Sequence, residues 1–135
     1  MKLVHCLGVM AAVAVISTAA ISQNAVTVAK SAAEAQKAIE ARQQVFKDMK
    51  KANDVMSAML KNQREFDAAL VATSAAQIQE LVGKIPAAFL VDTRQFPDIK
   101  TVARENIWSS QADFKAKSED TAKAAANVVA VAKGG

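Results

Sequence analysis

Glycine and proline are almost absent from three long stretches of this chain, and this absence constrains the fold more than any other feature. The stretches are rich in Ala, Lys, Glu, Gln and Met, which are residue types that favour helices. Apolar residues recur in them at steps of three and four, and none of the stretches alternates as a half-buried strand would. The sequence therefore predicts an all-α chain without strands.

The first two predicted helices are bounded by capping and breaking residues. Ser31-Ala32-Ala33-Glu34 has the form of a capping box, in which a hydroxyl and a carboxylate each accept an orphan backbone N–H, so the first helix should begin there. Its apolar stripe runs to Leu60, and the polar residues 61–64 allow the chain to turn. The second helix is expected from Asp67 to Pro86, because proline interrupts a helix.

The third predicted helix follows an unusually long connection. Residues 86–100 keep no helical period, and a connection of this kind either packs on the bundle or belongs to a functional site. The helix is expected from about Ala103 to Lys133, with Ile107 and Phe114 one heptad apart, and two glycines follow it. Its apolar face needs neighbours on more than one side, which a four-helix bundle would provide.

The first 29 residues have the layout of a secretory signal peptide. Lys2 is followed by an apolar run from Leu3 to Ser22 and then by small residues that a signal peptidase accepts. Cleavage is expected after Ala20, Ala25 or Ala29. The alternative is an uncleaved membrane anchor, since about 20 apolar residues can span a bilayer. We expect cleavage, a periplasmic location and no stable membrane insertion of the mature chain.

The only histidine and the only cysteine, His5 and Cys6, lie within this predicted signal peptide. A mature chain without them has no disulfide, no zinc site of the usual kind and no Ser-His-Asp or Cys-His catalysis. The formal net charge of +4 is small and its signs are interleaved, which argues against nucleic acid as a partner. An enzyme is therefore not expected.

Several segments between residues 31 and 135 resemble one known family. The runs from Arg42 to Lys50, from Phe66 to Ala69 and from Ile85 to Phe89 are similar to its first helix, its second helix and the loop that follows. Thr101 to Trp108 and Ala112 to Lys117 are similar to its entry into helix three. The family is cytochrome c′, the periplasmic four-helix haem proteins. The resemblance implies an up-and-down helical bundle, with three long helices present here and the fourth absent.

The resemblance also implies a haem pocket and assigns four residues to it. Arg42 and Gln43 match positions at the haem edge, where a guanidinium can pair with a propionate. Phe46 matches the bulky residue on the open face of the iron, and Thr101 matches a loop residue near the haem. Without the family, Phe46 would be a core residue and Arg42 a solvated charge at the edge of the stripe. A possible homodimer through the first two helices is implied as well.

One departure from the family concerns the cofactor directly. Family members attach haem c through Cys-x-x-Cys-His on a fourth helix, and this motif is absent from the chain. We therefore expect a signal peptide over residues 1–29 and an apparently truncated helical bundle over residues 30–135. The leading hypothesis is an incomplete haem protein for electron transfer or small-gas binding. The rivals are a haem-free exported interaction module that binds a partner helix or itself, and noncovalent haem held by Arg42 with a methionine ligand.

Overall fold

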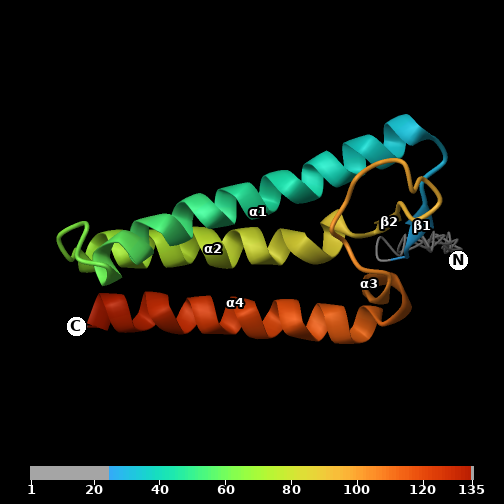
Figure 1. The fold of residues 1–135 in the computed structure, drawn as a ribbon. Coiled ribbons are helices and arrows are strands. Elements are labelled where there is room, and N and C mark those ends of the chain that lie inside the picture. Colours follow the sequence, from blue (N-terminus) through green and yellow to red (C-terminus); the bar gives the residue numbers. More distant parts are fainter. Residues whose placement is uncertain (1–24, 135) are drawn as a thin grey trace, which may run out of the picture.

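The computed structural model describes residues 25–134, so most of the predicted signal peptide and Gly135 lie outside the described residues. Within this range the chain forms three long helices, one short helix and two very short strands (Figure 1). None of these helices is long and apolar enough to cross a membrane. The predicted all-α bundle with three long helices is confirmed for the described part of the chain.

Helix α1 (Ala32–Leu60) begins where the capping box predicted it. The Ser31 hydroxyl accepts the Glu34 N–H at 3.2 Å, and the Glu34 carboxylate accepts the Lys30 N–H at 2.8 Å. The helix ends at the predicted polar turn, where Asn62 has a φ of 54°. Asparagine tolerates this left-handed conformation, which commonly terminates a helix.

Helix α2 (Ala68–Ala88) begins directly after Asp67, where its start was predicted, and the Asp67 carboxylate caps it by accepting the Leu70 N–H at 2.9 Å. The prediction that Pro86 ends the helix is wrong, since the helix continues for two more residues. Proline has no N–H, so it leaves the carbonyl of Val82, one turn earlier, without its usual donor. The buried Ser118 hydroxyl donates to that carbonyl at 3.1 Å. A neighbouring helix therefore replaces the hydrogen bond that the proline removes.

Two strands of two residues each correct the prediction that strands are absent. β1 (Thr27–Val28) pairs in parallel with β2 (Val91–Asp92), which follows shortly after α2. The Ala29 N–H extends the pairing by donating to the Asp92 carbonyl at 2.9 Å. Segments this short carry no alternating pattern, so periodicity cannot reveal them. The pairing ties residues 27–29 to the turn after α2.

The third predicted helix is divided in two. Helix α3 (Asn106–Ser109) is a single turn, and α4 (Gln111–Gly134) is the third long helix. Ser110 separates them with φ −130° and ψ 52°, which lies outside the helical region. The expected start near Ala103 is therefore wrong, because that residue belongs to the loop that leads into α3. Helix α3 lies at the end of the bundle where α4 begins (Figure 1).

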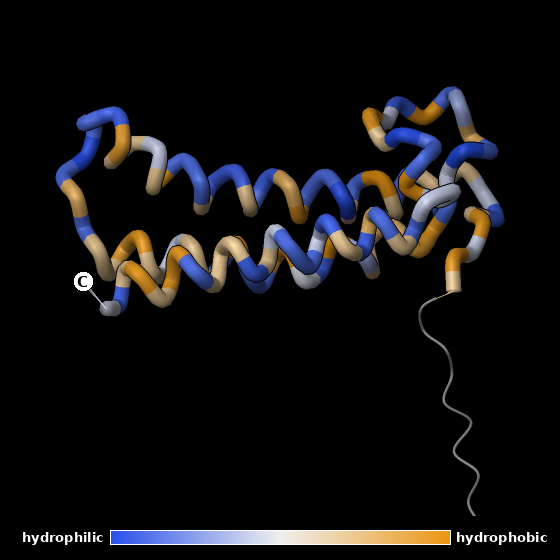
Figure 2. Tube along the Cα trace, turned by 90° about the horizontal axis from the view of Figure 1, so that it is seen from below, coloured by the Kyte–Doolittle hydropathy of each residue, from blue (hydrophilic) through white to orange (hydrophobic). Residues whose placement is uncertain are grey.

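Helix α2 lies between α1 and α4 and packs against both (Figure 1). Apolar residues recur along each long helix instead of forming one block, as amphipathic helices require (Figure 2). Small buried residues allow the helices to approach closely; they are Ala35, Ala52, Ala72, Ala75 and Ala125. The larger core residues Val82, Ile85 and Phe89 cluster toward the end of α2. Residues of α1, α3 and the first half of α4 pack against this cluster.

Candidate functional site

One groove brings together all four residues that the resemblance assigned to a pocket. Its volume is about 500 Å³, and it lies between one face of α1 and the segment that runs from Phe89 to Phe114. Helix α1 supplies three of the four predicted residues, and the loop before α3 supplies the fourth. The complete lining is Ile39, Arg42, Gln43, Phe46, Lys47, Lys50, Phe89, Thr101, Val102, Ala103, Ile107 and Phe114.

Three phenylalanines form an apolar wall of the groove. The rings of Phe89 and Phe114 have centroids 5.0 Å apart at 66°, and those of Phe46 and Phe89 are 6.4 Å apart at 70°. Both are edge-to-face arrangements, which aromatic pairs favour. Phe89 is 5% exposed, whereas Phe46 is 46% exposed. The interpretation of Phe46 as a core residue is therefore wrong, because its ring borders the open groove.

Arg42 is buried although it carries a charge, with an exposed fraction of 3%. Its guanidinium donates three hydrogen bonds to the turn after α2. Two acceptors are the carbonyls of Ala88, at 2.9 Å, and Val91, and the third is the Thr93 hydroxyl at 3.2 Å. The interpretation of Arg42 as a solvated charge is therefore wrong. The hydrogen bonds of Arg42 hold the turn after α2 against α1.

Aromatic rings and an ion pair complete the surroundings of Arg42. Its guanidinium carbon lies 4.8 Å from the ring centroid of Phe89 and 5.2 Å from that of Trp108. Trp108 Nε1 donates to the Phe89 carbonyl at 3.0 Å, and the guanidinium of Arg94 lies 5.6 Å from the Trp108 ring. Arg94 also pairs with the buried Asp92 at 2.7 Å. Two guanidinium groups and one indole are thus stacked beside the groove.

The pKa values of these charged groups respond to the same contacts. Burial lowers the pKa of Arg42, and the charge of Asp92 opposes that change. Hydrogen bonds from Arg94 hold the pKa of Asp92 below its ordinary value, although burial acts in the opposite direction. The same hydrogen bonds raise the pKa of Arg94. Asp92 and Arg94 therefore each stabilise the charged form of the other.

The remaining polar residues of the groove are exposed and surround its mouth. Gln43 and Thr101 are both exposed, and the Thr101 hydroxyl accepts the Ala103 N–H at 3.2 Å. Lys47 and Lys50 also line the groove, although neither was among the residues predicted from the sequence. They follow Gln43 and Phe46 by four residues, and this helical spacing was the signal that places them on the same face. The groove therefore combines an apolar wall with a positively charged mouth.

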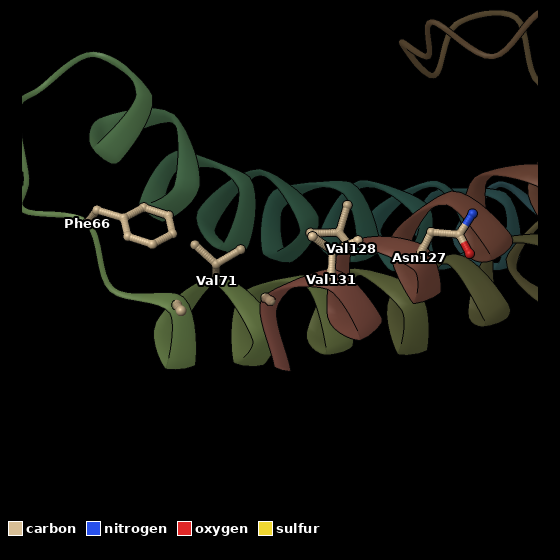
Figure 3. Close-up of a pocket in the computed structure, with 7 residues that line it drawn as sticks. Phe66, Val71, Asn127, Val128 and Val131 are labelled. Atoms are coloured by element: carbon tan, nitrogen blue, oxygen red, sulfur yellow. The ribbon is translucent and has the colours of Figure 1, made fainter. Parts of the chain in front are cut away.

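A second cavity of about 500 Å³ lies at the opposite end of the bundle (Figure 3). Phe66 and the first turn of α2 form one side, and the last turns of α4 form the other. Its lining residues are Phe66, Ala68, Val71, Asn127, Val128, Val131 and Ala132, and none of them is charged. Binding sites generally combine apolar walls with a few polar groups that orient the ligand. The first groove fits that description better.

Comparisons with known proteins agree with the resemblance. The sequence model of the family described as Cytochrome C' matches residues 37–135, a range that contains all four predicted groove residues. A cytochrome c' from Rhodopseudomonas palustris (strain ATCC BAA-98 / CGA009) is 37% identical over 76 residues, which are 56% of this chain and 51% of that protein. The chain thus spans about half the length of this curated relative. No solved structure matches the chain. Because the family match extends over more than half of its residues, the chain belongs to the cytochrome c′ family.

Proposed function

We propose that this chain binds haem in the groove lined by Arg42, Gln43, Phe46 and Thr101, and that it serves electron transfer or small-gas binding after export to the periplasm. The observation that carries the proposal is the convergence of these residues, from α1 and a distant loop, on one apolar groove. Membership of a haem-protein family supports haem as the ligand.

The groove residues fit both chemical parts of a haem. The faces of the porphyrin are flat and apolar, and the three phenylalanines of the wall offer a matching surface. The propionates are anionic, and the ammonium groups of Lys47 and Lys50 and the amide of Gln43 are donors at the mouth. When bound, the haem iron would supply the redox or gas-binding chemistry. The protein residues would orient the ring and exclude water from its apolar face.

The described residues do not supply an iron ligand of the expected kind. Residues 25–134 contain no histidine or cysteine. The methionines of α1 do not line the groove: Met59 is buried, Met49 packs against the Val82 cluster, and Met56 is half-buried elsewhere. The hypothesis of a methionine ligand is therefore not supported. That a Cys-x-x-Cys-His helix completes the pocket stays a prediction.

Titration of ferric haem into the exported, purified chain tests the proposal. We expect a shifted Soret band that saturates at one haem per chain. Free imidazole should shift the band further, because no residue between 25 and 134 offers an imidazole to the iron. Phe46→Glu should weaken binding about tenfold, since it places a charge against the apolar ring. Phe66→Glu is the matched control, because this exposed phenylalanine belongs to the other cavity.

Two outcomes would contradict the proposal. No shift of the Soret band would rule out haem binding by this chain and would favour the haem-free interaction module, for which the apolar cavity beside Phe66 is a candidate surface. Equal loss of affinity in both variants would mean that haem associates with exposed apolar surface in general, and not with the groove.

A further inference from the structure

The groove contains two kinds of cation, and they differ in how far they are already engaged. Arg42 is buried, and its donors are directed at the Ala88 and Val91 carbonyls and the Thr93 hydroxyl. Lys47 is exposed on the same helix face, and it makes no ion pair within the described residues. Two residues of one groove are therefore unequally available to a ligand.

Releasing Arg42 toward a ligand would be costly. The carbonyls of Ala88 and Val91 would lose a charged donor, and a buried acceptor without a partner destabilises a protein. The guanidinium would also leave its position over the rings of Phe89 and Trp108, to which the cation is attracted. The observed contacts therefore favour an Arg42 that remains on the turn after α2 whether or not a ligand is present.

We propose a division of roles between these two residues. Arg42 is a positioning residue that preforms the groove by holding the turn after α2 and Trp108 against α1, and Lys47 is the cation that receives a carboxylate of the ligand at the mouth. This inference rests on the proposed function, because the ligand considered is a porphyrin dicarboxylate. Lys50 is the weaker candidate for the second role, since its ammonium group already pairs with Asp54 at 2.5 Å.

Two iron-free porphyrins separate the roles. Protoporphyrin IX has two free carboxylates, and its dimethyl ester has none, so the ratio of their affinities measures recognition of the carboxylates alone. Trp108 is the only tryptophan of the chain, and acrylamide quenching of its fluorescence in the ligand-free protein measures how tightly its surroundings are packed. The affinity ratio therefore reports on the cations at the mouth of the groove. The quenching of Trp108 reports on the turn after α2 and the tryptophan that Arg42 holds.

The experiment uses the full exported chain and three substitutions. Arg42→Lys keeps the positive charge but loses the planar guanidinium and its fixed set of N–H donors. We expect this substitution to lower the affinity for both porphyrins by the same factor, about tenfold, and to increase the acrylamide quenching of Trp108 fluorescence. Lys47→Gln should lower the affinity for protoporphyrin IX about threefold. It should leave the affinity for the dimethyl ester and the quenching of Trp108 fluorescence unchanged. Lys37→Gln, at an exposed lysine of α1 away from the groove, should change none of these readouts.

Several results would overturn the proposal. One is an Arg42→Lys protein that loses its preference for the free acid while its Trp108 quenching remains unchanged. Another is a Lys47→Gln protein that binds the acid and the ester as the parent does. If circular dichroism shows that Arg42→Lys does not fold, Thr93→Val removes one acceptor of Arg42 and must change Trp108 quenching for the positioning role to stand.

Failure of the proposed function gives a different pattern. If the parent chain binds neither porphyrin, haem binding and the role of Lys47 are both wrong. The positioning role of Arg42 is still decided in that case, because the fluorescence of Trp108 is measured without ligand. An increase of quenching in Arg42→Lys supports it, and no increase contradicts it.

Discussion

At the scale of single residues, the groove depends on buried polar groups that all have partners. Among the described residues, no buried side-chain nitrogen or oxygen lacks a hydrogen bond. Arg42, Asp92 and Thr93 are each less than a tenth exposed, and all three lie in or beside the turn after α2. An unpaired buried polar group costs about 1–3 kcal/mol. Substitutions here should therefore affect the free energy of unfolding as well as ligand binding.

Asp92→Asn should remove part of the acid dependence of stability. The pKa of Asp92 is lower in the folded chain than in the unfolded chain because Arg94 donates to its carboxylate. Its contribution is therefore fully present above the unfolded pKa, near 4, and is lost as the pH falls through the folded pKa. We expect Asp92→Asn to lower the free energy of unfolding by about 1 kcal/mol at pH 7. Urea unfolding at several pH values between 7 and 2 measures both effects.

Asp98→Asn is the control for that measurement, because Asp98 is exposed and has no ion pair among the described residues. It should leave the free energy of unfolding at pH 7 nearly unchanged. If Asp92→Asn lost stability in parallel with the parent chain as the pH fell below 4, the Asp92 carboxylate would not be the titrating group.

The sequence identified residues of the groove but not what they do there. The family resemblance placed Arg42, Gln43, Phe46 and Thr101 together, and helical spacing could have added Lys47. The partners of Arg42 lie in the turn after α2, about fifty positions away. Local patterns contain no information on contacts at that separation, so the burial of this charge could not be predicted from them.

At the scale of the secondary-structure elements, the starts of α1 and α2 were predictable, whereas the end of α2 and the start of α4 were not. Ser31 and Asp67 cap the first turns with their own side chains, and this signal lies within four residues. Pro86 does not end α2 because the compensating donor, Ser118, comes from another helix. The break at Ser110 has no local signal of glycine or proline. A tertiary contact thus overrides local propensity at Pro86.

Ser118→Ala should destabilise the chain through Pro86. The substitution leaves the buried carbonyl of Val82 without a donor, so we expect a loss of about 1–2 kcal/mol in the free energy of unfolding. In a Pro86→Ala background the backbone N–H of residue 86 can donate to Val82 instead. The cost of Ser118→Ala should then fall to a few tenths of a kcal/mol. A double-mutant cycle measured by urea unfolding gives the coupling between the two sites.

Thr121→Ala controls for the loss of a hydroxyl from α4, since the Thr121 hydroxyl donates to the Lys117 carbonyl of its own helix. It should be neutral or slightly stabilising, because alanine favours helices more than threonine does. Additive effects of Ser118→Ala and Pro86→Ala would show that the proline and the serine do not compensate each other.

At the scale of the whole molecule, the fold is organised around α2, with α1 on one side and α4 on the other (Figure 1). This architecture was predictable because each long helix has its own apolar period, and the family supplied their arrangement. The parallel pairing of β1 with β2 was not predictable, because it joins two-residue segments from distant parts of the chain. This pairing also places the last residues of the predicted signal peptide, residues 27–29, within the folded structure.

The pairing distinguishes among the three predicted cleavage sites. Ala29 is 3% exposed and donates to the Asp92 carbonyl, and the Thr27 N–H donates to the Leu90 carbonyl at 2.8 Å. Cleavage after Ala29 would remove both hydrogen bonds. We therefore expect the exported chain to begin after Ala20 or Ala25, as mass spectrometry of the intact periplasmic protein would measure.

A mature chain that begins at Lys30 would contradict this expectation. As a complement, deletion of residues 27–29 should lower the melting temperature of the exported chain, because it removes the partner of β2. A deletion of the same length ending at Ala25 is the matched control, and it should leave the melting temperature unchanged.

For a chain that is exported as proposed, the ladder between β1 and β2 also implies an order of transport and folding. Thr27 pairs with Val91, so in such a chain the N-terminal strand would cross the membrane long before its partner does. Closing so long a loop is entropically unfavourable until α1 and α2 have formed, which makes this pairing a late event. On the proposed export, a signal peptidase would therefore act before the ladder closes. Proteolytic maturation and closure of the ladder would then be successive steps, and the second step would bury Ala29 against the turn after α2.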